Sequence, residues 1–153
     1  MDNGFTYSML EPIIREKLEN GATVTIQPKG TSMLPLIRQG QDEVILKKPS
    51  GRLNKYDIPF YKRESGQFVL HRIVKKRKND YVMCGDNQFV FEYGITDENI
   101  IAVAKGFIIN GEEIDAFNNG EYLEYKSRCL KNVGRRHPVA QLKYKIKRLK
   151  DGK

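Results

Sequence analysis

Short apolar runs separated by turn residues recur along residues 22–117, and this succession constrains the fold most strongly. The runs alternate or are rich in β-branched residues, as strands are, and Gly, Pro, Asn and Ser stand between them. We expect strands at 22–27, 42–48, 58–63, 67–75, 81–85, 100–109 and 112–117. Because several connections are short enough for hairpins, the pattern predicts a mainly β (α+β) protein.

Helices are expected at both ends of this strand-rich region. Residues 6–19 place five apolar side chains at helical spacing, namely Met9, Leu10, Ile13, Ile14 and Leu18. Asn119 is a good helix cap, and Pro138 opens a further helical segment. The 153 residues suffice for one domain with a core. We therefore divide the chain into a domain at 1–117 with its N-terminal helix and a helical extension at 118–153.

The positive charge of the chain is concentrated in the extension. Residues 126–153 carry eleven basic side chains and one acidic one, whereas residues 1–125 carry sixteen basic and eighteen acidic ones. A basic amphipathic helix suits a membrane surface or an acidic partner protein, and we expect either of these rather than nucleic acid. The alternative is that the apolar face of this helix packs onto the domain.

Several functional classes are disfavoured by the composition. The two cysteines, Cys84 and Cys129, form no CxxC motif, and His71 and His137 stand far apart, so we expect neither a metal site nor a cofactor. The longest apolar runs are far shorter than the roughly 20 residues of a membrane helix. The N-terminus lacks the basic start and apolar core of a secretory signal. We expect a cytoplasmic protein, at most peripheral at a membrane.

One loop presents a candidate nucleophile. Residues 30–35, GTSMLP, follow a predicted strand and expose Ser32 on a turn. A serine hydroxyl reacts at neutral pH only with a base in hydrogen-bond reach. His71, in the alternating run FVLHRIV at 68–74, is the candidate base. Two simpler explanations stay open: Ser32 closes a turn, and His71 faces an apolar layer as a core histidine.

A carboxylate often orients the imidazole of such a base. Asp86, in the CGDN turn at 84–87, is the first candidate, and Glu92 is the second. A turn aspartate also commonly bonds its own backbone. The spacing alone does not choose between these possibilities.

The ordered set of motifs resembles the signal peptidase I family. The set comprises GTSMLPLIRQG, a strand ending YKR, FVLHRIV, CGDN, EYGI and ENIIAV, in that order, and it lies within residues 21–105. The wider clan also contains the self-cleaving LexA-type repressors. The histidine before Arg72 matches the archaeal and endoplasmic-reticulum type, in which histidine replaces the lysine base of most bacterial members. The resemblance implies a compact, mainly β peptidase fold that binds its substrate as an added extended strand. The helices expected at the two ends would flank this fold.

The same resemblance implies roles for individual residues. Ser32 would be the nucleophile, His71 the general base and Asp86 the group that holds the imidazole, with Glu92 as a possible second carboxylate. Further residues of the serine loop would line the oxyanion and substrate side, namely Thr31, Met33 and Pro35, although Met33 also suits plain packing. The implied reaction is cleavage of a specific extended peptide, a precursor or leader, by acyl transfer to Ser32.

Two other functions remain as alternatives. A peptidase-like module can bind an extended peptide without cutting it. A LexA-like regulator fits less well, because a single helix before the serine loop leaves no room for a helix-turn-helix.

Overall fold

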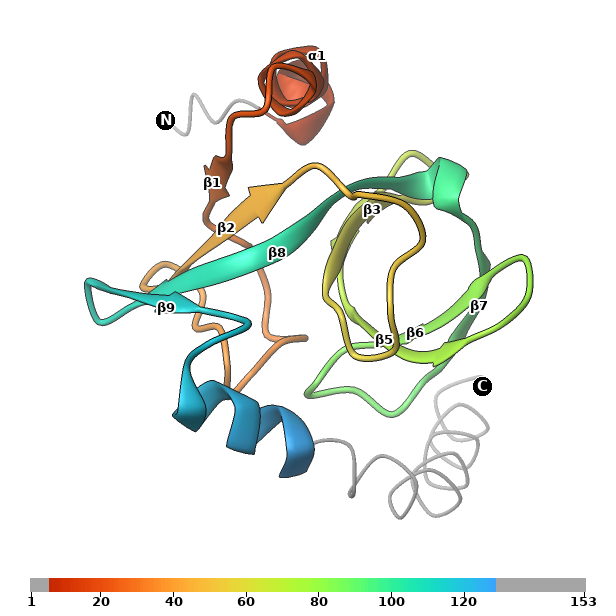
Figure 1. Cartoon of the computed structure of the whole chain (residues 1–153). Helices are drawn as coiled ribbons and strands as arrows, with labels where there is room; N and C mark the ends of the chain where they lie inside the picture. The colour runs from red at the N-terminus through yellow and green to blue at the C-terminus, as the bar shows by residue number, and fades with distance from the viewer. Residues whose placement is uncertain (1–5, 129–153) are drawn as a thin grey trace, which may run out of the picture.

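The computed structural model describes residues 6–128, and in them the mainly β fold expected from the sequence is confirmed. Helix α1 (Tyr7–Glu19) comes first, and a helical segment at 120–128 ends the described part (Figure 1). The strands between them are β1 (Val24–Ile26), β2 (Glu43–Lys47), β3 (Pro59–Lys62), β4 (Phe68–Leu70), β5 (Arg72–Lys76), β6 (Tyr81–Cys84), β7 (Glu92–Ile95), β8 (Ile100–Ile109) and β9 (Glu112–Asp115), with a 3₁₀ turn, η1 (Asp97–Asn99), before β8.

The strands form two antiparallel sheets. The larger sheet has the order β1-β2-β8-β3-β4, with β9 also paired to β8, and the smaller has the order β5-β6-β7. Strand β8 is long enough to pair with β2, β3 and β9 along its length. On the right of Figure 1 the strands curl into a half-barrel. The order leaves β4 at an edge of the larger sheet.

The single strand expected at 67–75 is divided at His71. Strand β4 pairs with β3 in the larger sheet, whereas β5 pairs with β6 in the smaller one. Backbone hydrogen bonds explain the change, because Ile73 donates to the carbonyl of Asp57 at 2.9 Å and accepts from Tyr56 at 2.7 Å. His71 therefore lies where the chain leaves one sheet for the other.

The expected apolar face of α1 is partly wrong. Ile14 and Leu18 are buried, but Met9 and Ile13 are 63% and 52% exposed. Each residue of a helix turns by about 100°, so Met9 and Ile13 lie beside the buried stripe instead of on it. The helix begins one residue after the expected start, because Thr6 is its N-cap and its side chain accepts from the N–H of Met9 at 3.4 Å.

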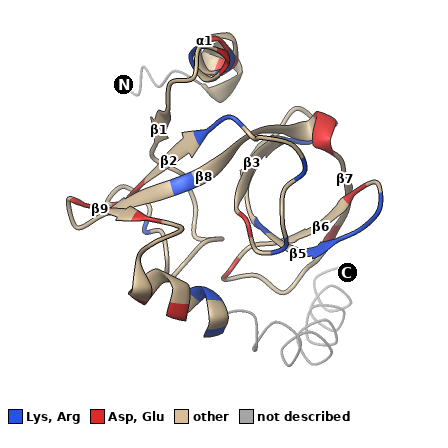
Figure 2. Cartoon of the chain, in the orientation of Figure 1, with Lys and Arg blue, Asp and Glu red and all other residues tan. Residues whose placement is uncertain are grey.

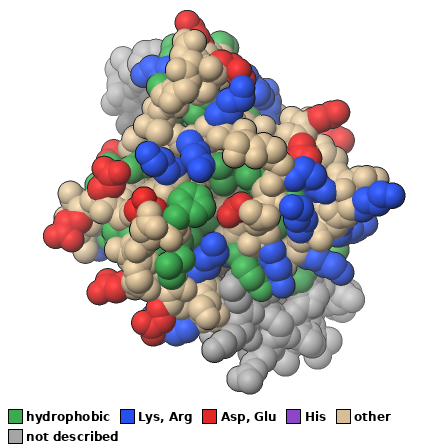
Figure 3. All heavy atoms as spheres, viewed as in Figure 1, with side chains coloured by type: hydrophobic (Ala, Val, Ile, Leu, Met, Phe, Trp, Pro, Cys, Tyr) green, Lys and Arg blue, Asp and Glu red, His purple; other side chains and the backbone are tan. Residues whose placement is uncertain are grey.

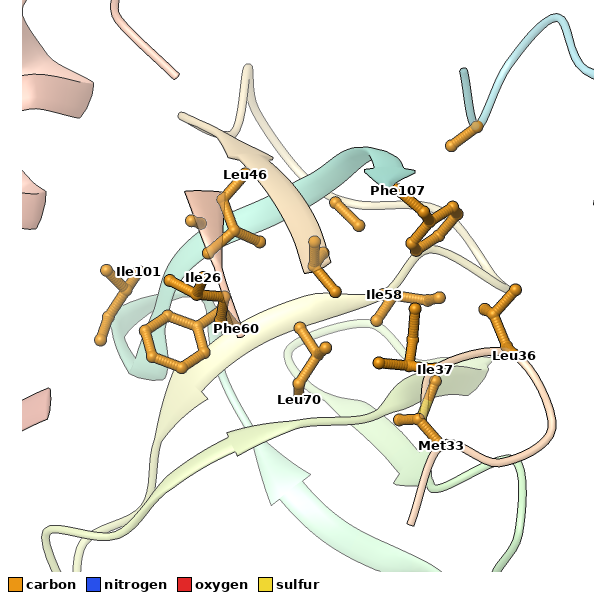
Figure 4. Close-up of a cluster of buried hydrophobic side chains, with 14 of the residues drawn as sticks. Ile26, Met33, Leu36, Ile37, Leu46, Ile58, Phe60, Leu70, Ile101 and Phe107 are labelled. Atoms are coloured by element: carbon orange, nitrogen blue, oxygen red, sulfur yellow. The ribbon is translucent and has the colours of Figure 1, made fainter. Parts of the chain in front are cut away.

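Most of the buried apolar side chains form one core inside the larger sheet (Figure 4). It joins side chains from the strands, such as Leu46, Phe60 and Phe107, to Met33 and Ile37 of the serine loop. A second cluster lies where the two sheets meet and includes Tyr61, Val69 and Ile73. Residues 28–42 are therefore fixed to the core at several points.

The helical segment at 120–128 belongs to the same packed body. Tyr122 is 6% exposed, and its ring centroid lies 4.9 Å from that of Phe107. The cap expected at Asn119 is present, because its side chain accepts from the N–H of Tyr122 at 2.9 Å. The start of the extension assigned to 118–153 therefore packs on the domain. The basic segment after Pro138 and the partners expected for it lie outside the described residues.

Charged side chains of both signs are spread over the described surface. In Figure 3 basic and acidic groups intermix on the visible face, with hydrophobic side chains between them. Figure 2 shows a local excess of positive charge where β5 leads into β6, and the exposed residues there are Lys75, Lys76, Arg77 and Lys78. Across residues 6–128, no helix combines the length and apolarity that crossing a membrane requires.

Candidate active site

Residues 28–42 form the serine loop, which carries Ser32, and several of its apolar side chains pack in the core. Met33, Leu36 and Ile37 are buried, whereas Ser32 is half-buried and Thr31 is exposed. Gly30 has a φ of +89°, a left-handed conformation that favours glycine before the serine. Apolar side chains thus anchor the loop while the polar ones stay near the surface.

An ion pair closes the C-terminal end of the loop. Arg38 donates from Nε and Nη2 to Asp42 at 2.8 and 2.7 Å, and the Asp42 side chain is fully buried. The hydrogen bonds from Arg38 lower the pKa of Asp42, so this carboxylate stays charged. Arg38 also donates to Asn110 at 2.6 Å and ties the loop to the end of β8.

The turn that carries Asp86 is clamped onto the serine loop. The backbone N–H of Asn87 donates to the carbonyl oxygen of Ser32 at 2.8 Å, and its side-chain Nδ2 donates to that of Thr31 at 3.0 Å. Gly85 packs so closely that a Cβ there would lie 2.6 Å from the Ser32 carbonyl oxygen. The fold therefore brings together the serine loop and the CGDN turn.

His71 is buried, with 6% of its surface exposed, and lies beside Tyr61. Its Nδ1 is 3.4 Å from the Tyr61 hydroxyl. Burial, with a further contribution from the nearby charge of Arg63, lowers the pKa of His71 to about 4. The imidazole is therefore neutral at physiological pH and has an unprotonated nitrogen, as a general base requires.

Glu92 is connected to His71 through Tyr61. The Tyr61 hydroxyl donates to Oε1 of Glu92, and Arg63 Nε donates to Oε2 at 2.5 Å. Burial first, and then the bond to Glu92, raise the pKa of Tyr61 above its ordinary value, which keeps the hydroxyl protonated. Sequence reasoning named Glu92 as a second carboxylate but missed Tyr61 and Arg63.

Asp86 has different partners from those expected. Both of its carboxylate oxygens accept from Arg72 at 2.7 Å, and Oδ2 also accepts from the Tyr125 hydroxyl at 2.9 Å. The side chains of Arg72 and Asp86 are 1% and 3% exposed. Within residues 6–128, no hydrogen bond joins Asp86 to His71. The orienting role of Asp86 stays a prediction, and its immediate contacts are those of a buried ion pair.

A pocket of about 500 Å³ brings the candidate nucleophile and base to one cavity. Residues 28–33, including Thr31, Ser32 and Met33, form one part of its lining, and residues 67–71 of β4 and its flanks form another. Apolar side chains such as Ile26 and Phe60 complete the lining, whereas Pro35 is not among the lining residues. Ser32 and His71 share this pocket without a direct hydrogen bond in the described part of the chain.

Comparison of the chain with protein-family models, with curated proteins and with solved structures finds no match. Over residues 6–128, no group of three or more His, Cys, Asp or Glu side chains is arranged to hold a metal ion. Four groups of the candidate site can take part in chemistry. These are a hydroxyl, a neutral imidazole, a protonated phenol and a carboxylate.

Proposed function

We propose that this protein is a serine peptidase of the signal peptidase I type, which cleaves a specific extended peptide by acyl transfer to Ser32. The observation that carries the proposal is that Ser32 and His71, far apart in sequence, line one pocket. A hydroxyl and a neutral imidazole in one cavity are the pair that nucleophilic acyl transfer needs.

The expected mode of substrate binding is strand addition. Strand β4 is an edge strand, and residues 67–71 that contain it line the pocket. An edge strand offers unpaired N–H and C=O groups to an extended peptide. A peptide paired along β4 would pass by His71 and the serine loop. The apolar lining, including Ile26 and Phe60, would receive apolar side chains of the substrate.

The proposed reaction follows from these groups. Ser32 Oγ attacks the carbonyl carbon of the scissile peptide bond while His71 takes the hydroxyl proton. Within residues 6–128, the N–H of Ser32 donates no hydrogen bond, so it is available to the oxyanion that forms. His71 then gives the proton to the leaving amine as the C–N bond breaks. Water, deprotonated by His71, releases the acyl group and regenerates Ser32.

The test is cleavage of a diverse peptide mixture by the full chain, followed by mass spectrometry. We expect discrete cleavage products, and Ser32→Ala should abolish them while the protein stays folded. His71→Ala should have the same effect. Ser65→Ala is the control, because Ser65 is also a serine in a turn with a nearby glycine, but it does not line the pocket. Cleavage that survives in the Ser32→Ala variant would end the proposal.

The same experiment distinguishes the peptidase from the two alternative functions. A peptide-binding module would retain peptides from the mixture without producing fragments, with equal affinity in the wild type and the Ser32→Ala variant. A self-cleaving regulator of the LexA type would cut its own chain and leave the added peptides intact. Either result would replace the peptidase proposal.

A further inference from the structure

We propose that Tyr61 is a positioning residue, which links Glu92 to His71 and fixes the imidazole as the tautomer protonated on Nδ1. The proposal rests on the proposed function, since it assigns a role within the same site. Tyr61 lies in the strand ending YKR, but the motifs from which the function was inferred assign it no role and imply no such link.

The Tyr61 hydroxyl has a single proton, and this determines which way its hydrogen bonds to Glu92 and His71 run. A tyrosine hydroxyl has one proton, and that proton is donated to Oε1 of Glu92. The hydroxyl oxygen can therefore only accept from His71, whose Nδ1 lies 3.4 Å away. An imidazole that donates from Nδ1 is unprotonated at Nε2 when it is neutral. Nε2 is then the nitrogen that can take the proton of Ser32.

The link is rigid because each member is held by other contacts. Tyr61 is fully buried on β3, where it pairs with Val69 of β4. Glu92 begins β7, and Arg63 holds its second oxygen at 2.5 Å. Arg63 in turn donates to Gln67 at 2.6 Å. Three strands therefore fix the phenol beside the imidazole.

The link also provides negative charge when His71 takes the proton. The imidazolium would be stabilised by the Tyr61 oxygen, and this oxygen is polarised by the Glu92 carboxylate behind it. Asp86 is less suited to this task, because Arg72 occupies both of its oxygens. The carboxylate that acts on His71 through a hydrogen-bonded path is thus Glu92.

The chain contains a closely matched control in Tyr81. Tyr81 is also fully buried, in the same apolar cluster as Tyr61, and its hydroxyl also donates to a carboxylate, that of Asp97. Asp97 is paired with Arg52 at 3.2 Å, as Glu92 is with Arg63. Tyr81→Phe therefore removes a buried hydroxyl that donates to an arginine-paired carboxylate, and within residues 6–128 no hydrogen bond joins this hydroxyl to His71. The Tyr81 hydroxyl also accepts from the N–H of Leu53 at 3.0 Å and from Arg52 at 3.3 Å.

The decisive measurement is the tautomer of His71 in the full chain at neutral pH, read by nitrogen NMR of the isotopically labelled protein. The chain has two histidines, and a His137→Gln background leaves only the signals of His71. We expect protonation on Nδ1 in the wild type and in Tyr81→Phe. Tyr61→Phe should lose this preference. Glu92→Ala should reverse it, because the freed Tyr61 proton then turns to Nδ1.

Kinetics supply a second readout. Tyr61→Phe should lower kcat by roughly tenfold or more at an unchanged KM, since only proton transfer is affected. Tyr81→Phe should leave kcat as in the wild type. The two experiments test the two proposals separately. A wild type that cuts no peptide refutes the proposed function, whereas its NMR spectrum still tests whether Tyr61 fixes the tautomer of His71. His71 protonated on Nε2 in the wild type, or unchanged in both Tyr61→Phe and Glu92→Ala, would overturn the positioning role.

Discussion

The N–H of Asn87 donates to the carbonyl oxygen of Ser32 at 2.8 Å, and this bond joins the CGDN turn to the serine loop. The side chain of Asn87 adds a second bond to the carbonyl of Thr31. The turn therefore holds Ser32, the proposed nucleophile, in place whether or not Asp86 takes part in the proposed reaction. Peptidase activity should then depend on the packing of this turn.

Gly85→Ala tests that dependence. The new Cβ would lie 2.6 Å from the Ser32 carbonyl oxygen, and because this oxygen belongs to the backbone, only a shift of the turn or of the loop can relieve the clash. Misplacement of a reacting group by about 1 Å can cost on the order of 100-fold in rate, and we expect a loss of that size in kcat/KM. Amide hydrogen exchange at Asn87 should also become faster.

Gly120→Ala is the control for this substitution. Its Cβ would meet nothing within 4 Å, so exchange at Asn87 and kcat/KM should match those of the wild type. If Gly85→Ala left both quantities unchanged, the turn would not position Ser32.

Asp86→Asn should act first on stability. It removes the charge that compensates the buried Arg72, and breaking a buried pair costs about 3–5 kcal/mol. Urea denaturation should show a free energy of unfolding lower by about this amount. In the double variant with Arg72→Met, no buried charge is left unpaired, so its loss should be smaller than the sum of the single losses. Additive losses would show that the two side chains do not interact.

His71 should make stability depend on pH. Burial lowers its pKa from 6.5 to about 4 in the folded protein, so between these values the unfolded chain binds a proton that the folded protein does not. The free energy of unfolding therefore falls as the pH falls through this window, by at most about 3 kcal/mol. Above pH 6.5 the contribution of His71 is constant.

Carboxylates of proteins ordinarily titrate near the acidic end of this window as well. The contribution of His71 is therefore measured as the difference between the wild type and a variant without this histidine. Urea denaturation of the wild type and of His71→Gln across the window should give curves that converge or cross as the pH falls. Parallel curves would mean that His71 titrates equally in the folded and unfolded chains.

Tyr122→Ala should destabilise the whole described domain. The ring packs on Phe107, and the hydroxyl accepts from Arg72 at 3.3 Å. Truncation of a buried aromatic residue costs about 3–5 kcal/mol, and thermal unfolding should show a correspondingly lower midpoint. Leu123→Ala, at a neighbouring position that is 40% exposed, should change stability by no more than about 0.5 kcal/mol. Equal effects of the two substitutions would show that the 120–128 helix is not part of the packed core.

The buried stripe of α1 can be tested in the same way. Leu18 is 2% exposed, and Leu18→Ala should lower the free energy of unfolding by about 2–5 kcal/mol. Met9→Ala removes a side chain that is 63% exposed and should change it by less than about 0.5 kcal/mol. A large loss from Met9→Ala would place Met9 in a contact that residues 6–128 do not show.

The local elements of the fold were largely predictable from the sequence. The run at 100–109 was expected as one strand and is β8, and the cap expected at Asn119 is present. Strand β7 was missed, since Gly94 interrupts its short run with a φ of +78°. The division at His71 was also missed, because alternation continues through it and only pairing with Asp57 and Tyr56 separates β4 from β5.

Part of the candidate site could also be predicted from the sequence. Ser32 and His71 were singled out, and the structure brings them to one pocket. Tyr61 was overlooked, although the predicted hairpin contained the signal. Its short turn sets a register that pairs Tyr61 with Val69, two residues before His71 on the same face.

The sequence by itself determined most of the strands, the turns and the position of Ser32 on a turn, because these depend on neighbouring residues and on the period of the chain. Only the tertiary structure decided which carboxylate serves which partner. His71 and Arg72 are adjacent but have different partners, and a buried guanidinium must be paired. Arg72 therefore takes Asp86, and Glu92 is connected to His71 through Tyr61. The spacing of these residues along the chain does not predict this pairing, because the pairing depends on which strands the fold places next to one another.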